Sequence, residues 1–279
     1  MVEEFSFELF YANRTELWRV IMSTDKHNEF IETGLNITED IEGLIKLNEI
    51  PLHYIFGSPG IYTRKINLVR LLAQYELFQM SRDVPGSIVE CGVFQGAGLL
   101  FYAKLIEIFC SGDRWKKVYG FDTFDGFTHI DEKDKTNHKK DGTVFTQVHK
   151  GGYSSKSFLP VLEKFVELHH KESFTPGFER IKLYPGDVAK TLPRFKQECG
   201  GERISLLVLD MDLYQPTKIA LEHLYEMVTP GGVIVLDEYS HRRWPGEVRA
   251  FDEFFGDKKP ELKKFNWSST PGAYFIKGQ

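Results

Sequence analysis

The chain has few cysteines and no long apolar run. Three of its 279 residues are cysteine, Cys91, Cys110 and Cys199. They form neither an even disulfide set nor a pair at metal-binding spacing, so we expect a reducing compartment. No apolar stretch approaches the ~18 residues that span a bilayer, and the acidic first residues are unlike a signal peptide. We therefore expect a cytoplasmic protein that does not associate with membranes.

An excess of basic charge is also lacking. The formal net charge is -5, and acidic and basic residues are interspersed along the chain. Because no basic stripe marks a polynucleotide footprint, we expect no nucleic acid partner. Apolar residues, in contrast, are plentiful: 42% of the chain is hydrophobic and 14% is aromatic. That is enough for one well-packed core of domain size with an additional segment.

The first 85 residues have helical patterning broken by loops. Apolar residues recur at helical spacing in residues 14–22 and 66–80, and residues 38–47 predict another helix. Residues 52–64 are rich in Gly, Pro, Tyr and His, so we expect a loop there. We predict that residues 1–85 form a helical N-terminal extension.

From residue 86 onward, strands alternate with helices. Predicted strands cover residues 87–90, 118–122, 181–184, 206–210 and 233–237, and predicted helices cover 99–109, 157–169, 216–227 and 248–255. This alternation is typical of an open, doubly wound α/β sheet. Residues 265–268 and 273–276 predict a closing antiparallel hairpin. Residues 128–176 form a polar insertion, which is either a solvated loop or a lid over the site.

The turn after the first predicted strand carries the clearest motif. Its sequence is ECGVFQGAG, residues 90–98. Gly92, Gly96 and Gly98 allow the backbone to approach a ligand closely and to turn into a helix. A dinucleotide site favours Gly-x-Gly-x-x-Gly, which brings a pyrophosphate to the helix N-terminus. Here Glu90 precedes the first glycine; a carboxylate repels a pyrophosphate and can hold an amino group. The motif therefore favours S-adenosylmethionine over NAD.

Two further acids follow predicted strands. Asp122 ends the second strand, where a carboxylate would hold a ribose diol. Asp187 follows Gly186 after the next strand and is a candidate contact for an adenine amino group. Either acid is alternatively a helix N-cap or a turn residue. Three acids at successive strand ends favour the cofactor site.

Four more carboxylates end the next two predicted strands. Asp210 and Asp212 follow one apolar strand, and Asp237 and Glu238 follow the other. They would repel one another unless a cation or protons compensate. Mg²⁺ prefers such oxygen ligands, and it would bind two vicinal hydroxyls and lower the pKa of one. A remaining carboxylate would take the proton while the oxygen attacks a methyl group. Alternatively, some of these acids cap helices or pair with basic neighbours: Lys218, Arg242 or Arg243.

In combination, these segments resemble the metal-dependent sugar O-methyltransferases of the macrocin and aminocoumarin (TylF-like) family. Members act on deoxysugars of macrolide and aminocoumarin antibiotics or on nucleotide-linked deoxysugars. The likeness rests on residues 90–98, 120–127, 186–187, 191–193, 210–214 and 231–239. It implies a class I S-adenosylmethionine-dependent methyltransferase fold with seven mostly parallel strands, Mg²⁺, and a homodimer or larger homo-oligomer.

The resemblance also implies roles for individual residues. Asp210, Asp237 and Glu238 would hold the metal. Asp212 and Asp210 would be the catalytic residues, with Asp212 the candidate general base. The family often has a second aspartate where this chain has Glu238. The implied cofactor contacts are Glu90, Gly92, Gly96, Gly98, Asp122, Thr123, Phe124, Gly186, Asp187 and Asp210.

We therefore expect an O-methyltransferase, dependent on S-adenosylmethionine and Mg²⁺, that acts on a hydroxyl of a small-molecule deoxysugar. The acceptor is either nucleotide-linked or part of a glycosylated natural product. Residues 86–279 would form the catalytic domain, with residues 1–85 covering the substrate and building the oligomer. One alternative is another small-molecule chemistry, or a scaffold role, on this fold. Another is a haloacid-dehalogenase-like phosphatase, because Asp210 and Asp212 follow an apolar strand; Tyr214 stands where that class has Thr or Val.

Overall fold

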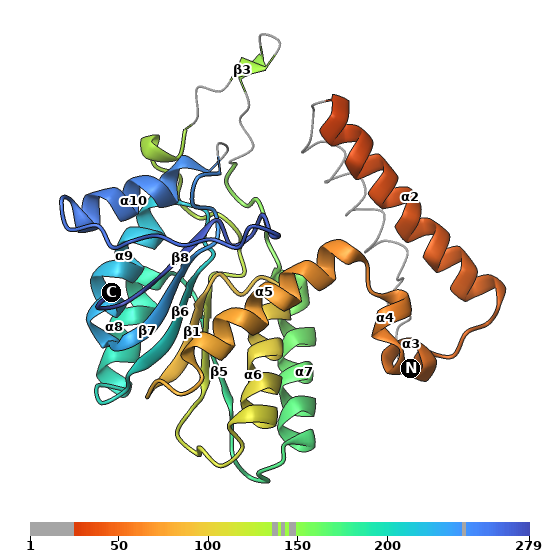
Figure 1. Ribbon diagram of the computed structural model, residues 1–279, viewed down its shortest axis with the longest axis horizontal. Coiled ribbons are helices and arrows are strands. Elements are labelled where there is room, and N and C mark those ends of the chain that lie inside the picture. Colours follow the sequence, from red (N-terminus) through yellow and green to blue (C-terminus); the bar gives the residue numbers. More distant parts are fainter. Residues whose placement is uncertain (1–24, 136–138, 141–142, 145–148, 242–243) are drawn as a thin grey trace. The chain divides into compact units, whose positions relative to one another are not determined.

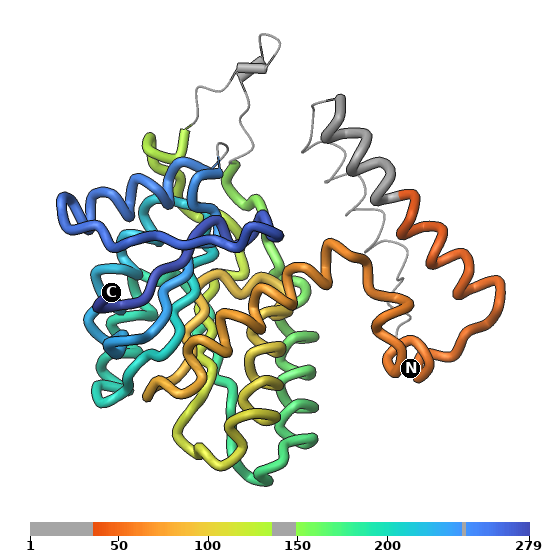
Figure 2. Tube along the Cα trace, viewed as in Figure 1, coloured from red at the N-terminus to blue at the C-terminus, as the bar shows by residue number. Residues whose placement is uncertain are grey.

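The computed structural model describes residues 25–135, 139–140, 143–144, 149–241 and 244–279 (Figures 1 and 2). The predicted helix at residues 14–22, and both Arg242 and Arg243, lie outside these residues. The chain divides into two compact units, Met1–Lys65 and Ile66–Gln279. No helix in the described ranges is both long and apolar enough to cross a membrane.

The smaller unit contains three described helices, α2 (Asp25–Leu47), α3 (Leu52–Gly57) and α4 (Pro59–Tyr62). The helix predicted at residues 38–47 is the second half of α2. The loop predicted at residues 52–64 is wrong, because two short helices occupy most of it. Pro51 is the N-cap of α3 and Pro59 begins α4, positions where a fixed φ and a missing N–H suit a helix start. These prolines start helices, whereas the sequence pattern indicated a break.

The larger unit is built on a six-stranded sheet with the order β5-β2-β1-β6-β7-β8. Its strands are β1 (Ser87–Cys91), β2 (Val118–Asp122), β5 (Ile181–Pro185), β6 (Ile204–Leu209), β7 (Val228–Leu236) and β8 (Ala273–Ile276). All neighbours pair in parallel except β7 and β8, which are antiparallel. The strand order changes direction between β1 and β6, so this is the topological switch point of the predicted doubly wound sheet.

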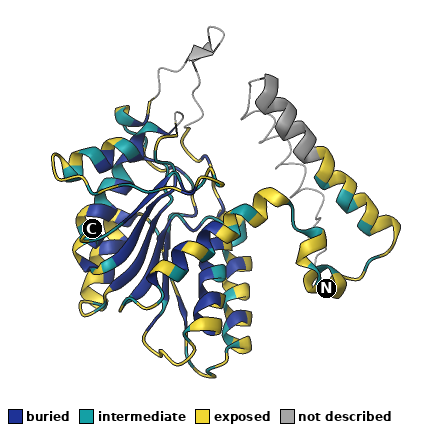
Figure 3. Cartoon of the chain, viewed as in Figure 1, coloured by how far each residue is buried: buried dark blue, intermediate teal, exposed yellow. Residues whose placement is uncertain are grey.

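Helices cover both faces of this sheet (Figure 1). One face carries α5 (Lys65–Ser81), α6 (Ala97–Phe109) and α7 (Leu159–Glu172), and the other carries α8 (Val188–Glu198), α9 (Tyr214–Leu224) and α10 (Pro245–Phe255). Alternate strand residues serve the two cores: Ile88 and Val208 pack toward α5 and α6, whereas Val89 and Leu209 pack toward α8 and α9. Side chains of a strand alternate between faces, so the apolar strands are buried on both sides (Figure 3).

The predicted closing hairpin is wrong in its first half. Residues 273–276 form β8 as predicted, but residues 265–268 form no strand. A single β-bridge, between Lys263 and Tyr274, pairs β8 with the segment before it. Phe265 instead stacks its ring on Tyr274, with ring centroids 5.1 Å apart. The described sheet therefore has six strands, where the resemblance implied seven.

The insertion at residues 128–176 is only partly irregular. It contains the short helices η1 (Glu132–Asp134) and η2 (Lys156–Phe158), the two-residue strands β3 (Lys139–Lys140) and β4 (Thr143–Val144), and α7. The predicted helix at residues 157–169 is confirmed as α7 with η2 before it. Leu162 of α7 is fully buried in the core. The second half of the insertion is thus part of the body of the larger unit.

Candidate active site

Strand register brings the predicted site residues to one edge of the sheet. Cys91 of β1 is paired with Phe121 of β2 and with Leu209 of β6, and Leu209 is paired with Leu236 of β7. The residues that follow extend the same ladder. Asp210 N donates to the Cys91 carbonyl at 2.8 Å, and Asp237 N donates to the Leu209 carbonyl at 3.0 Å. Gly92, Asp122, Asp210 and Asp237 therefore lie at the carboxyl ends of adjacent strands at the switch point, where open α/β sheets bind ligands.

Gly92 is required by its contact with the neighbouring strand. Its φ is +98°, and a Cβ built there would lie 1.7 Å from the carbonyl oxygen of Asp210. Only glycine adopts this conformation without strain and leaves room for that oxygen. The tight turn therefore fixes the end of β1 against the backbone of Asp210. Its predicted contact with a cofactor remains a prediction.

Glu90 is a buried carboxyl group facing a pocket. Its side chain is 4% exposed, and Oε2 has no hydrogen-bond partner among the described residues. Gly98 leaves space for it, since a Cβ there would lie 2.1 Å from Glu90 Oε1. Burial, and then the charge of Asp210, raises the pKa of Glu90 well above its usual range. An unpartnered carboxyl group in such a position is a suitable acceptor for a charged amino group.

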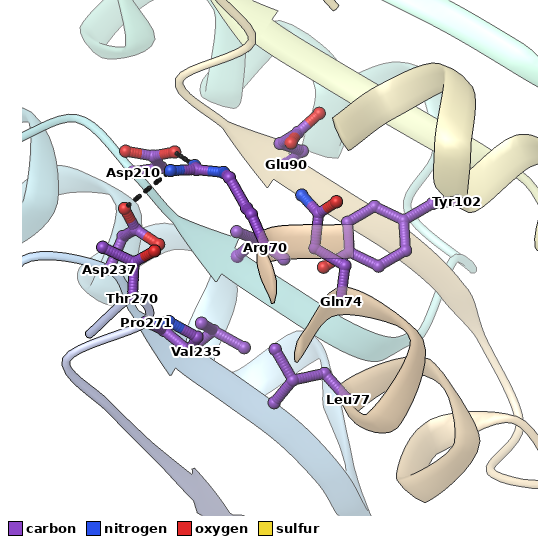
Figure 4. A pocket seen from close by; sticks show the side chains of 11 residues that line it. Arg70, Gln74, Leu77, Glu90, Tyr102, Asp210, Val235, Asp237, Thr270 and Pro271 are labelled. Carbon is purple, nitrogen blue, oxygen red and sulfur yellow. Dashed lines mark hydrogen bonds and ion pairs between the residues drawn. The ribbon is translucent and has the colours of Figure 1, made fainter. Parts of the chain in front are cut away.

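The pocket beside Glu90 is formed by α5, α6 and the ends of β6 and β7 (Figure 4). Arg70, Gln74 and Leu77 of α5 line it at the i, i+4 and i+7 positions of one helix face. The other lining residues are Glu90, Tyr102, Val208, Asp210, Val235, Asp237, Thr270 and Pro271. The sequence motifs did not predict the contribution of α5. The polar Arg70 and Gln74, on a helix whose pattern is mostly apolar, are the sequence feature that sets this face apart.

Asp122 organises the loops at the end of β2. Its Oδ2 accepts a hydrogen bond from Phe94 N at 2.7 Å, and its Oδ1 accepts one from Phe124 N at 2.6 Å. Burial raises the pKa of Asp122 above its usual range, although these backbone donors oppose the shift. Thr123 Oγ1 donates to the Gly126 carbonyl at 2.8 Å. In this structure Asp122 therefore has the turn role that the sequence left open, and a ribose contact remains a prediction.

Asp187 is exposed and caps a helix. Its Oδ1 accepts a hydrogen bond from Ala189 N at 2.9 Å at the start of α8. Gly186, with φ of +126°, links back to β2 through a 2.8 Å bond from its N–H to the Asp122 carbonyl. The N-cap alternative is thus what the structure describes for Asp187, and an adenine contact stays untested.

The carboxylates at the ends of β6 and β7 have an arginine as their immediate partner. Arg70 Nη2 lies 2.6 Å from Asp210 Oδ2, and Nη1 lies 3.6 Å from Asp237 Oδ2 (Figure 4). Glu238 Oε2 lies 3.0 Å from His241 Nδ1. No three His, Cys, Asp or Glu side chains in the described part of the chain are grouped closely enough to hold a metal ion. The predicted metal ligands lie at the carboxyl ends of neighbouring strands, but their side chains are not grouped closely enough to hold one ion.

One predicted pairing partner of these acids, Lys218, lies against other residues. Lys218 Nζ donates to the Tyr214 hydroxyl at 3.2 Å and lies 3.7 Å from Glu253 Oε2. Arg242 and Arg243 are outside the described residues. Among the described residues, the cation beside Asp210 and Asp237 is Arg70, which lies 140 positions before Asp210 in the sequence.

The acidic cluster at the ends of β6 and β7 holds more carboxyl groups than Arg70 can neutralise. Its members are Asp210, Asp212, Asp237, Glu238 and Glu247. Burial, followed by the charges of neighbouring carboxylates, raises the pKa of Asp212 and of Asp237 well above the usual range of aspartate. Glu247 of α10 is fully buried, and both of its carboxylate oxygens lack a hydrogen-bond partner among the described residues. Burial and the charges of Asp237 and Glu238 raise its pKa as well. Such a site favours an additional cation or bound protons.

Comparison with known proteins identifies the family. Residues 67–270 match the macrocin O-methyltransferase (TylF) family. The chain belongs to this family. The match spans the pocket helix α5, the glycine turn and the acidic cluster, and it ends at Thr270 in the pocket wall. The resemblance that the sequence motifs indicated is therefore confirmed.

Curated relatives of this macrocin O-methyltransferase family member include O-methyltransferases of Streptomyces and Micromonospora species. A tetracenomycin rhamnosyl 4'-O-methyltransferase of Streptomyces olivaceus is 29% identical over 187 residues, which cover 65% of this chain and 64% of that protein. The mycinamicin III 3''-O-methyltransferase of Micromonospora griseorubida is 28% identical over 156 residues, or 56% of each chain. The chain thus spans less than two thirds of the length of these relatives.

Solved structures extend the match to nearly the whole chain. The calicheamicin methyltransferase CalS11 superposes with a TM-score of 0.80 at 26% identity, covering 93% of this chain and 95% of that one. The O-methyltransferase NovP has a TM-score of 0.53 at 22% identity over 77% of this chain. These neighbours confirm the class I methyltransferase fold.

Proposed function

We propose that the chain is an S-adenosylmethionine-dependent O-methyltransferase that methylates a hydroxyl of a deoxysugar. The observation that carries the proposal is the arrangement at the switch point of the sheet. The buried Glu90 and its glycine turn adjoin the acidic residues Asp210 and Asp237 in a member of the macrocin O-methyltransferase family. The relatives named above act on a rhamnosyl group, on mycinamicin III and, for CalS11, on TDP-rhamnose. They support an acceptor that is either nucleotide-linked or part of a glycoside.

Residues at the ends of β1, β2 and β5 would hold S-adenosylmethionine, which supplies an electrophilic methyl group when bound. The unpartnered Oε2 of Glu90 fits the positively charged amino group of the methionine part. Asp122, Thr123, Phe124, Gly186 and Asp187 form the adjoining loops at the same edge. These loops would receive the ribose and the adenine.

Residues at the ends of β6 and β7 fit a magnesium ion by their chemistry. Oxygen ligands are what Mg²⁺ prefers, and the raised pKa values of Asp210 and Asp237 reflect buried negative charge that a cation would stabilise. Asp210, Asp237 and Glu238 would hold the ion. When bound, it would lower the pKa of the acceptor hydroxyl.

Asp212 is the proposed general base. It follows β6 by a short turn and has a left-handed backbone with φ of +62°, a strained conformation that is enriched at active sites. Burial raises its pKa well above the usual range, and the charges of Asp210 and Glu238 add to that effect. A carboxylate with a raised pKa is a stronger base than an exposed one, so Asp212 is suited to take the proton of the acceptor hydroxyl.

We further propose that residues 1–85 cover the acceptor and build a homo-oligomer, and that the insertion at about residues 128–176 provides a lid. Exposed apolar side chains of the smaller unit support the oligomer. Phe56 is 77% exposed and Ile61 is 74% exposed, and clustered exposed apolar residues are typical of interaction surfaces. We expect the enzyme to act in the cytoplasm on small molecules.

A methyl-transfer assay tests this function. The full chain is incubated with labelled S-adenosylmethionine and with nucleotide-linked deoxysugars or finished glycosides, in Mg²⁺ or in EDTA. We expect methylated sugar that depends on Mg²⁺. The Asp212→Asn variant should lower kcat by about 10²- to 10⁴-fold with little change in cofactor affinity. The matched control is Asp83→Asn, which changes an exposed aspartate.

Three results would contradict parts of the proposal. Cofactor binding without turnover on any sugar contradicts the acceptor class. Full turnover in EDTA contradicts the metal. An unchanged kcat in Asp212→Asn contradicts its role as the base.

A further inference from the structure

Arg70 reaches from α5 into the acidic cluster. Figure 4 shows its guanidinium between Asp210 and Asp237, with a dashed line to each. Its side chain is 47% exposed, whereas those of Asp210 and Asp237 are 21% and 9% exposed. The arginine therefore approaches two more deeply buried acids from the outer side of the cluster. A guanidinium is always charged in proteins, so Arg70 is a cation.

The guanidinium uses the oxygens that a divalent ion would need. It contacts Oδ2 of Asp210 at 2.6 Å and lies 3.6 Å from Oδ2 of Asp237. Mg²⁺ binds oxygen ligands at about 2.1 Å, so an ion that shares both oxygens would lie within a few ångströms of the guanidinium. Two cations at such a separation repel each other strongly in a partly buried site.

We propose that Arg70 and a divalent cation occupy the Asp210–Asp237 pair in turn, so that Arg70 must leave before the metal binds. This inference rests on the metal site of the proposed function. Arg70 is then the resident counter-ion of the metal-free protein. It stabilises two buried carboxylates that would otherwise repel each other. Because the competent form is only part of the population, Arg70 also weakens the apparent metal affinity.

The nature of the side chain makes the exchange feasible. A half-exposed arginine on the surface of a helix has several rotatable bonds, so its guanidinium can withdraw into solvent without a change of fold. Arg70 is thus a positioning residue for the acids and not a catalytic residue.

Metal titration of the full-length chain tests the inference. The probes are Mn²⁺, followed by electron paramagnetic resonance of the free ion, and Mg²⁺, followed by calorimetry. Arg70→Gln should bind Mn²⁺ about 10- to 100-fold more tightly than wild type, the range expected if Arg70 holds the pair in about 90% to 99% of molecules. Arg70→Lys keeps the charge but loses the planar fork, so its affinity should lie between the two.

Arg82→Gln is the matched control. It removes the same charge just beyond the end of α5, from an exposed pair with Asp83 at 3.0 Å, and should leave Mn²⁺ affinity unchanged. Thermal unfolding gives a second readout. In EDTA, Arg70→Gln should have a lower Tm than wild type, and saturating Mn²⁺ should remove most of that difference.

The possible outcomes separate this inference from the proposed function. Equal or weaker Mn²⁺ binding by Arg70→Gln overturns the competition while leaving the metal in place. Binding by Arg70→Gln alone supports occupation of the pair by Arg70 and overturns metal dependence of the wild type. Binding by none of the variants overturns both. If Arg70→Gln does not fold, an affinity of Arg70→Lys equal to wild type overturns the competition.

Discussion

Glu247 lies in the first turn of α10 with its side chain fully buried. Both of its carboxylate oxygens lack a hydrogen-bond partner among the described residues, and the charges of Asp237 and Glu238 add to the effect of burial on its pKa. A buried carboxyl group in such surroundings keeps its proton to higher pH than an exposed one. Ionisation of this group would destabilise the folded state.

This predicts a pH dependence of stability. The folded state holds the proton of Glu247 at pH values where the unfolded chain has lost it, above the ordinary pKa of 4.5. Stability therefore falls as pH rises from that value toward the raised pKa. We expect Glu247→Gln to remove this contribution, so that the variant loses less stability than wild type between about pH 5 and about pH 8.

Urea unfolding in EDTA at several pH values measures the effect. Glu226→Gln is the control, because Glu226 is an exposed residue and its substitution should leave the slope unchanged. Parallel profiles for wild type and Glu247→Gln would contradict the prediction and would show that Glu247 is ionised in the folded protein.

At the scale of elements, the turn between β1 and α6 leaves little room for added atoms. Gly92 and Gly96 both have positive φ, and a Cβ at Gly92 would meet the backbone carbonyl of Asp210, the residue after β6. A backbone carbonyl cannot rotate away as a side chain can. The end of β1 and the position of Asp210 are therefore coupled through this one contact.

We predict that Gly92→Ala destabilises the protein by about 3 kcal/mol or more, from the left-handed backbone and the added atom together. The free energy of unfolding in urea measures this. Gly112→Ala is the matched control, since a Cβ at Gly112 has no atom within 4 Å. A change in Gly92→Ala as small as that of the control would show that the turn can relax.

The elements that sequence patterns predicted well are those whose signals are local. Apolar strands that end in acids predicted β2 and β6, and helical spacing predicted α5 almost to the residue. The failures have other causes. The Thr-Pro-Gly turn between residues 265–268 and 273–276 predicts a hairpin, but β8 pairs with β7 and meets the preceding segment in one bridge, at Lys263. At Pro59 the sequence indicated a loop, but the fixed φ and missing N–H of proline suit the first turn of a helix.

At the scale of the whole molecule, the acids of the site could be predicted because parallel strands end at one edge of the sheet. Arg70 could not, since its contact with Asp210 depends on how α5 packs across the sheet and not on any local pattern. The pairing of Glu238 with His241 was likewise hidden, because a loop conformation decides it. Predicting a site from strand ends thus finds the residues on the sheet and misses those that helices supply.

The exposed apolar residues of the smaller unit lead to a prediction about the oligomeric state. If its exposed apolar residues build the proposed oligomer, a charge placed among them should separate the subunits, because burying an unpaired charge is costly. We expect Phe56→Glu to shift the protein to a smaller assembly in light scattering after size exclusion. Trp115→Glu is the control, since Trp115 is 85% exposed but belongs to the larger unit. A wild-type monomer, or an unchanged mass in Phe56→Glu, would contradict the prediction.

Strand β8 and the residue before it pair with the end of β7 next to Asp237. β8 pairs with β7, and the N–H of Gly272 donates to the carbonyl of Asp237 at 2.7 Å. During synthesis the N-terminal parts of a chain emerge from the ribosome first. Asp210 and Asp237 are therefore made well before the segment that fixes Asp237 and completes the pocket wall. A nascent chain that stalls before Gly272 would carry Asp210 and Asp237 without the segment that fixes Asp237 and completes the pocket wall.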